Sequence, residues 1–148
     1  KFRSNKSIYE FIKGFIDQKY IVDSSVINPQ NISVSYFDDQ LQALKYVGNL
    51  EKESHVLTLP ASIYKTDLYT PFNKYGTSFN VIGQEFDAVT LIIGDNIKYG
   101  PKGKLMSTGT YYDSALSLIQ NITRTRKYIN LIIVNNDSIF SRVMSILN

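Results

Sequence analysis

Two nearly continuous apolar stretches, residues 86–93 and 129–134, constrain the fold of this chain more than any other feature. Both are rich in valine, leucine and isoleucine. A strand with one solvated face alternates apolar and polar side chains, whereas a strand buried on both faces does not. The two stretches are therefore expected to be central strands of a parallel sheet.

Weaker patterns surround these strands. Residues 32–37 alternate like a half-buried strand, and shorter strands are predicted over 55–59 and 77–81. Apolar residues at helical spacing predict helices over 6–19, 38–50 and 111–127, and a last helix that follows residue 136. The candidate N-caps are Ser4 or Asn5, Asp38 or Asp39, and Asn136 or Asp137.

Strands that alternate with helices predict an α/β fold, in three layers with a mostly parallel central sheet and helices on both faces. The chain has 148 residues, which suits one domain over 1–148. Because it begins with Lys1 rather than methionine, we expect it to be a fragment of a longer protein. Ligands of such sheets bind at the carboxyl ends of the strands, so a site is expected there.

Composition excludes several classes of protein. With no cysteine and one histidine, the chain has neither a disulfide framework nor a metal site made of thiolates or several imidazoles. No apolar run approaches the length of a membrane span, and no signal peptide is recognisable, so we expect a cytoplasmic protein without a membrane partner. The formal net charge of +3 permits a polyanionic partner without requiring one.

Familiar nucleotide and hydrolase motifs are absent from the sequence. It has no Gly-x-x-x-x-Gly-Lys-Ser/Thr loop, no Gly-x-Gly-x-x-Gly turn and no Gly-x-Ser-x-Gly elbow. The acidic pairs at 38–39 and 51/53 fit helix caps or exposed helix ends better than a catalytic dyad. The domain is therefore not expected to bind and cleave a nucleotide by itself.

Three short segments are the candidates for function: 2–4, 83–85 and 123–126. The second places a glycine and the acidic Glu85 just before a buried strand. In the third, about 100° per residue turns Arg124 away from the apolar face of the predicted helix and Arg126 toward it. Arg126 is then predicted to snorkel, to pair with a carboxylate or to interact with the helix C-terminus. The turn with Gly83 and the helix with Arg124 are expected to be walls of the ligand crevice.

In this order the three segments resemble motifs IV, V and VI of the second RecA-like motor domain of superfamily 1 helicases, the UvrD/PcrA/Rep-like group. Residues 2–4 read Phe-Arg-Ser, where that group has Tyr-Arg-Ser. Residues 83–89 are similar to Gly-Leu-Glu-Phe-Asp-x-Val, and residues 123–126 to Thr-Arg-Ala-Arg. The second segment is closer still to bacterial and phage helicase-like ATPases whose motif V reads Ile-Gly-Gln-Glu-Phe-Asp. The resemblance implies a P-loop NTPase-type fold.

The resemblance also implies roles. ATP and Mg²⁺ would be held mainly by a first RecA-like domain that is missing from this chain. Arg3 would reach the γ-phosphate, and Arg124 would be the arginine finger. Gly83, Gln84 and Glu85 would contact the ribose and phosphate region, whereas Arg126 would have no contact with ATP. Closing of the cleft between the domains would move them along single-stranded DNA or RNA.

Several alternatives stay open. Where many relatives carry Thr-Ile-His and then Lys-Gly or Gln-Gly, this chain has Thr-Ser-Phe at 77–79 and Ile-Gly at 82–83. The parent protein could therefore be a nucleotide-gated defence or signalling ATPase that does not unwind nucleic acid. The chain could also be a plain interaction domain, in which Arg3 is a surface residue, Glu85 pairs with a lysine and Arg124 is a solvated cation.

Other segments also have two interpretations. The aromatic stretch 61–76 either stacks bases or closes the hydrophobic edge of the domain. Residues 94–110, with three lysines, are predicted to form a long, mobile polar loop. A structural role is favoured for His55 over a catalytic one.

Overall fold

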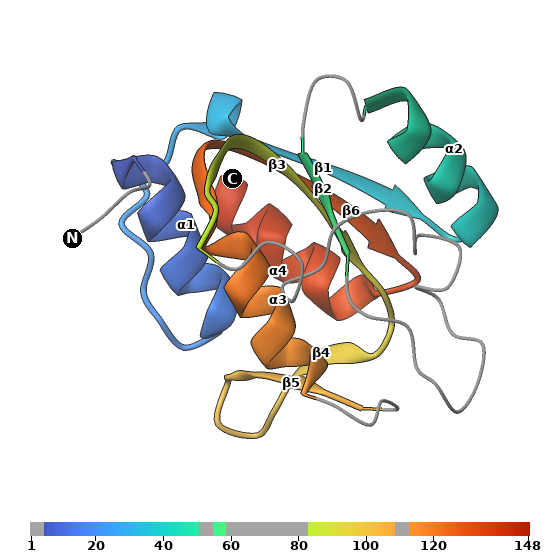
Figure 1. Cartoon of the computed structure of the whole chain (residues 1–148). Helices are drawn as coiled ribbons and strands as arrows, with labels where there is room; N and C mark the ends of the chain where they lie inside the picture. The colour runs from blue at the N-terminus through green and yellow to red at the C-terminus, as the bar shows by residue number, and fades with distance from the viewer. Residues whose placement is uncertain (1–4, 51–54, 59–82, 109–112) are drawn as a thin grey trace.

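The computed structural model describes residues 5–50, 55–58, 83–108 and 113–148 (Figure 1). Within these ranges four strands form one parallel sheet in the order β1-β6-β3-β2. The strands are β1 (Ile32–Phe37), β2 (His55–Leu57), β3 (Phe86–Ile93) and β6 (Thr125–Val134). The two apolar stretches lie in the middle of the sheet, as predicted, and both are fully buried toward their carboxyl ends.

The first and last helices begin directly after N-cap residues that the sequence predicts. The side chain of Asn5 accepts the N–H of Ile8 at 2.8 Å and begins α1 (Lys6–Ile16). In the same way Asn136 accepts the N–H of Ile139 at 3.2 Å and begins α4 (Asp137–Leu147). The other helices are η1 (Pro29–Asn31), α2 (Gln40–Leu50) and α3 (Ser114–Ile122). These side-chain acceptors satisfy N–H groups that the first helical turn leaves unpaired.

Helices cover both faces of the sheet. Neighbouring residues of a strand point to opposite faces. The ring of Phe37 contacts Tyr46 of α2, at 5.4 Å between centroids, and the ring of Tyr36 contacts Phe140 of α4 at 5.2 Å. α2 and α4 therefore lie on opposite faces, and α1 packs against α4 (Figure 1). This three-layer α/β arrangement with a mostly parallel sheet confirms the predicted fold class.

Side chains from both faces of the sheet and from the helices form one hydrophobic core. Phe11 and Phe15 of α1 are fully buried, with stacked rings 5.8 Å apart. Arg142 of α4 fixes the far end of α1, because its guanidinium donates to the carbonyls of Gly14, Asp17 and Tyr20. The core therefore ties both terminal helices to the central strands.

The predicted helix over 111–127 is too long. α3 ends at Ile122, and β6 begins at Thr125. Residues 125–134 contain several β-branched residues, and pairing with β3 and β1 outweighs any local helical tendency. Arg126 therefore lies on a strand with its side chain 47% exposed, and its predicted place toward the apolar side of a helix is wrong.

The prediction of a long polar loop over 94–110 is also wrong for much of that range. β4 (Ile97–Tyr99) and β5 (Leu105–Ser107) form an antiparallel hairpin. It is docked on the end of α1, because the Tyr99 hydroxyl donates to the Phe15 carbonyl at 2.5 Å and Lys104 pairs with Asp17 at 2.8 Å. Burial raises the pKa of Tyr99, so this hydroxyl stays protonated.

Two further helices and one strand are shorter than predicted. The helix expected over 6–19 ends at Ile16, the one expected from 38 begins at Gln40, and the strand expected over 55–59 ends at Leu57. The aromatic stretch 61–76 and the strand predicted over 77–81 lie outside the described residues.

Candidate functional site

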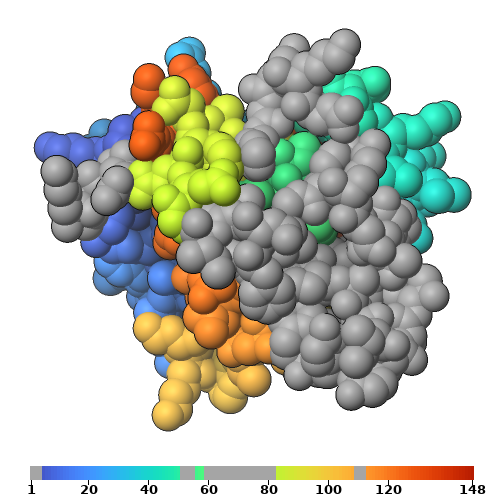
Figure 2. Space-filling model, in the orientation of Figure 1, coloured from blue at the N-terminus to red at the C-terminus, as the bar shows by residue number. Residues whose placement is uncertain are grey.

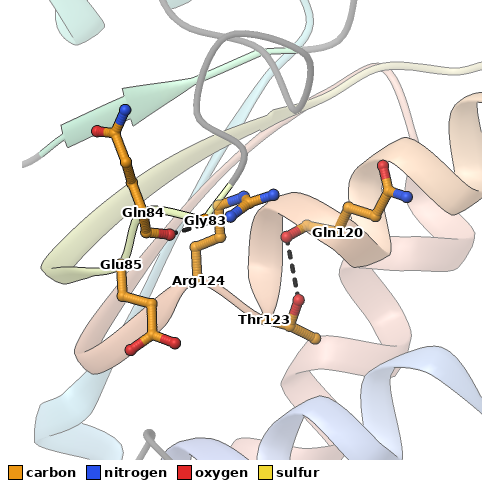
Figure 3. Close-up of a pocket in the computed structure, with 6 residues that line it drawn as sticks. All are labelled: Gly83, Gln84, Glu85, Gln120, Thr123 and Arg124. Carbon is orange, nitrogen blue, oxygen red and sulfur yellow. Dashed lines mark hydrogen bonds between the residues drawn. The ribbon is translucent and has the colours of Figure 1, made fainter.

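A pocket of about 290 Å³ lies beside the turn that precedes β3 and the end of α3 (Figure 3). Its lining consists of Gly83, Gln84, Glu85, Gln120, Thr123 and Arg124. The structure thus brings Arg124 together with the three predicted residues of the turn. Arg3, the remaining predicted site residue, lies outside the described residues.

The pocket is at the amino ends of β3 and β6. These strands are parallel neighbours, so the segments that precede them meet at one edge of the sheet. The N–H of Phe86 donates to the carbonyl of Arg124 at 2.9 Å and joins the two segments directly. Gly83 has φ +80°, a conformation that residues with a side chain rarely adopt. The expectation that these walls lie at the carboxyl ends of the strands is therefore wrong, because both motifs come before their strands.

Arg124 follows the last turn of α3 rather than lying within a helix. Its backbone N–H donates to the carbonyl of Asn121 at 3.1 Å. Its guanidinium Nη1 donates to the carbonyl of Gln84 at 3.0 Å, and this hydrogen bond joins the Arg124 side chain to the turn before β3. The Nε atom is buried and has no hydrogen-bond partner in the described part of the chain. A guanidinium carries five N–H donors, so several stay available to an acceptor in the pocket.

The polar residues of α3 differ in their exposure to solvent. Gln120 is exposed and lines the pocket, whereas Ser117 and Asn121 are buried. The amide of Asn121 donates to the carbonyl of Thr58 at 3.1 Å, after the end of β2. Sequence reasoning did not assign Gln120 to the site, although its spacing of four residues from Arg124 is a signal for a shared side.

Glu85 is turned toward Arg126, with 3.3 Å between its Oε1 and Nε of Arg126. Figure 3 shows its carboxylate directed away from the guanidinium of Arg124. Asp87 stands 3.7 Å from Nζ of Lys127 and 4.0 Å from Nη1 of Arg126. Of the three interpretations given for Arg126, the pairing with a carboxylate is therefore confirmed.

The donors around the pocket are suited to an anion. Arg124 brings a permanent positive charge, Gln120 can donate from its amide, and the glycine turn exposes backbone. The described residues contain no group of three or more histidine, cysteine, aspartate and glutamate residues that could hold a metal ion. The arrangement can bind and stabilise negative charge that another group of atoms presents to it.

Comparisons with known proteins bear on the fold. No protein-family model matches the sequence, and no curated protein matches it. A crystal structure of the C-terminal domain of a possible DNA helicase from Lactobacillus plantarum WCFS1 matches the fold with a TM-score of 0.58. The two chains are 16% identical, and the match covers 99% of this chain and 96% of that one. At this identity the match shows a shared fold.

Among the helices in the described ranges, none has both the length and the apolar character that crossing a bilayer requires.

Proposed function

We propose that this chain is the second motor domain of an ATP-dependent helicase or translocase, which completes a site for ATP held mainly by a first RecA-like domain. The observation that carries the proposal is the meeting of Arg124 with the Gly83–Glu85 turn in one pocket. The fold shared with the C-terminal domain of a possible DNA helicase supports it.

The residues fit a polyphosphate. Arg124 lines the pocket and uses Nη1 on the carbonyl of Gln84, so its other Nη–H groups can donate to phosphate oxygens. Gly83 and Gln84 offer backbone groups, and the carboxylate of Glu85 is drawn toward Arg126 rather than toward Arg124. In this proposal Gly83, Gln84 and Glu85 border the ribose and phosphates, and Arg3 reaches the γ-phosphate.

Arg124 is the proposed arginine finger. Negative charge spreads over the phosphoryl oxygens in the transition state of phosphoryl transfer, and a fixed guanidinium stabilises that charge more than the charge of the ground state. The hydrogen bond to the carbonyl of Gln84 holds the guanidinium in place before the reaction. ATP supplies the transferred phosphoryl group, and the first domain would bind Mg²⁺.

The test replaces Arg124 in the protein that joins this chain to its nucleotide-binding domain. Arg124→Ala is expected to lower ATP turnover about 10³–10⁵-fold, as loss of an arginine finger does, with little change in nucleotide affinity. Arg124→Lys keeps the charge but loses the planar fork, so it should also be impaired.

Lys98→Ala, which removes an exposed cation of the β4–β5 hairpin, is the matched control. Turnover of Arg124→Ala within a factor of about two of the wild type would refute the arginine finger.

The departure at residues 77–79 favours a second candidate, a nucleotide-gated defence or signalling ATPase that does not unwind nucleic acid. The two candidates differ in partner. Single-stranded DNA or RNA should stimulate ATP hydrolysis by a helicase or translocase, because the strand completes its working cycle. Hydrolysis that neither nucleic acid stimulates would favour the gated ATPase.

A further inference from the structure

The pairing of β3 with β6 is irregular beside the pocket. Phe86 is level with Thr125, but Ala88 is level with Tyr128. One residue of β3, Asp87, therefore faces two residues of β6, Arg126 and Lys127. This is a β-bulge, in which the strand with the extra residue bends and its side chains are redirected.

The bulge gathers charges that a regular strand would separate. In a regular strand Arg126 and Lys127 would point to opposite faces of the sheet. Here both cations reach Asp87, at 4.0 Å from Nη1 of Arg126 and 3.7 Å from Nζ of Lys127. Arg126 also reaches Glu85, at 3.3 Å from its Nε. We call Glu85, Asp87, Arg126 and Lys127 the bulge cluster.

The bulge cluster is continuous with the pocket. Glu85, which Arg126 holds, directly follows Gln84, whose carbonyl accepts the guanidinium of Arg124. The N–H of Phe86 also donates to the carbonyl of Arg124, which is a second link between the two segments. Arg126 is therefore linked to Arg124 through the turn that lines the pocket, and it does not itself line the pocket.

We propose that Arg126 is a positioning residue that holds the Gly83–Glu85 turn, and with it the guanidinium of Arg124, in place for phosphate. This inference rests on the proposed function. The two pairs with Asp87 are exposed and add little to stability, and in the pair with Glu85 the carboxylate is 21% exposed but Arg126 is 47% exposed, so this pair also contributes modestly. The effect of Arg126 is expected at the site instead.

The first test compares Arg126→Ala, Arg126→Lys and Lys127→Ala in the protein that contains the nucleotide-binding domain. Because displacement of a catalytic group by about 1 Å can cost 100-fold, Arg126→Ala should lower turnover at saturating ATP about 10-fold to 100-fold. The KM for ATP and the melting temperature should change little. Arg126→Lys should recover part of the turnover, since an ammonium can still pair with Glu85.

Lys127→Ala is the matched control, because it removes a cation of the same cluster that does not contact Glu85, and its turnover should equal that of the wild type. If turnover by Arg126→Ala equals that of the wild type while Arg124→Ala is inactive, Arg126 has no positioning role and the proposed function stands. If Arg124→Ala stays active, the proposed function fails.

A second measurement on this chain is independent of ATP hydrolysis. NMR of the Arg124 Nε–H group reports how firmly its guanidinium is held. Arg126→Ala should lower the order parameter of this group, and Lys127→Ala should not. An unchanged order parameter in Arg126→Ala would overturn the inference, whatever the outcome of the activity measurements.

Discussion

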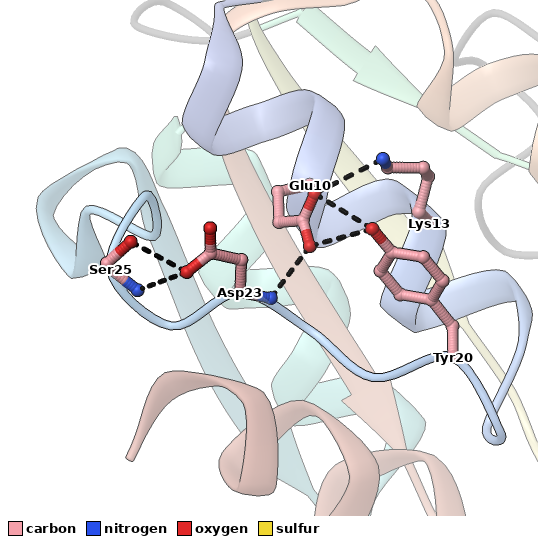
Figure 4. Close-up of polar contacts among 5 residues, drawn as sticks. All are labelled: Glu10, Lys13, Tyr20, Asp23 and Ser25. Atoms are coloured by element: carbon pink, nitrogen blue, oxygen red, sulfur yellow. Dashed lines mark hydrogen bonds and ion pairs between the residues drawn. The ribbon is translucent and has the colours of Figure 1, made fainter.

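Glu10 offers a quantitative test of how the first helix is fixed to the chain that follows it (Figure 4). Its carboxylate is buried, with the residue 7% exposed. It accepts the hydroxyl of Tyr20 at 2.9 and 3.1 Å and the N–H of Asp23 at 2.8 Å, and Lys13 lies 3.3 Å away. Burial acts to raise the pKa of Glu10, but the hydrogen bonds from Asp23, Tyr20 and Lys13 together hold it below its ordinary value.

Glu10→Gln keeps the shape of the side chain and removes one of its two acceptor oxygens. With its amide oxygen in the place of Oε2, the Tyr20 hydroxyl and the Asp23 N–H keep an acceptor, but that acceptor no longer carries a charge. Hydrogen bonds to a charged group contribute about 1.5–3 kcal/mol and hydrogen bonds to a neutral group about 0.5–1.5 kcal/mol, so the loss of charge costs about 1–2 kcal/mol. The lost pair with Lys13 adds about 0.2–0.5 kcal/mol, as for other pairs spaced along a helix. The free energy of unfolding should therefore fall by about 1–3 kcal/mol at pH 7.

The pH dependence gives the second half of this prediction. Because the folded-state pKa of Glu10 is lowered, its contribution is fully present above the ordinary value of 4.5 and is lost as the pH falls through the lower folded-state value. Urea unfolding of wild type and Glu10→Gln at pH 7 and near pH 3 measures this contribution. The difference between the two proteins should shrink in acid.

Asp17 and Asp23 also have lowered pKa values, because of hydrogen bonds from Lys104 and from Ser25, respectively. Their acid dependence is common to wild type and variant, so it cancels in the comparison. A difference at pH 7 below about 0.5 kcal/mol, or one that stays constant into acid, would refute the proposed role of the carboxylate.

Two further predictions concern backbone contacts. Asn136 caps α4 and also donates to the carbonyls of Gly94 and Ile97 at 2.8 and 2.7 Å, so Asn136→Ala should cost about 2–4 kcal/mol in urea unfolding, as a lost cap plus lost hydrogen bonds to buried carbonyls. Asn5→Ala, which removes a cap alone, should cost about 1 kcal/mol, and equal losses in the two variants would contradict this account. Gly83→Ala should lower the free energy of unfolding by about 1–2 kcal/mol, because alanine is strained at a φ of +80°. A Cβ there would meet nothing within 4 Å, so the cost comes from the backbone conformation, and unchanged stability would disprove the strain.

Local chemistry in the sequence was enough to predict several features. The uninterrupted apolar stretches 86–93 and 129–134 indicated central strands, since only a strand covered on both faces can dispense with polar side chains. Asn5 and Asn136 indicated helix starts, because a short polar side chain reaches the free N–H groups of the first turn. The motifs at 83–85 and 123–124 indicated residues that share one pocket.

Other features were decided only by contacts between distant parts of the chain. The boundary between α3 and β6 depends on the pairing of residues 125–134 with β3, which no local pattern contains. The hairpin over 97–107 depends in the same way on its docking against α1.

The sequence by itself determined which two apolar stretches lie in the middle of the sheet and which segments carry the candidate site. Tertiary structure alone decided that these segments meet at the amino edge of the sheet and that a bulge turns Arg126 toward Glu85. The physical reason is that hydrophobic patterning and capping act within a few residues. Strand register is set by backbone hydrogen bonds between segments about forty residues apart in the chain.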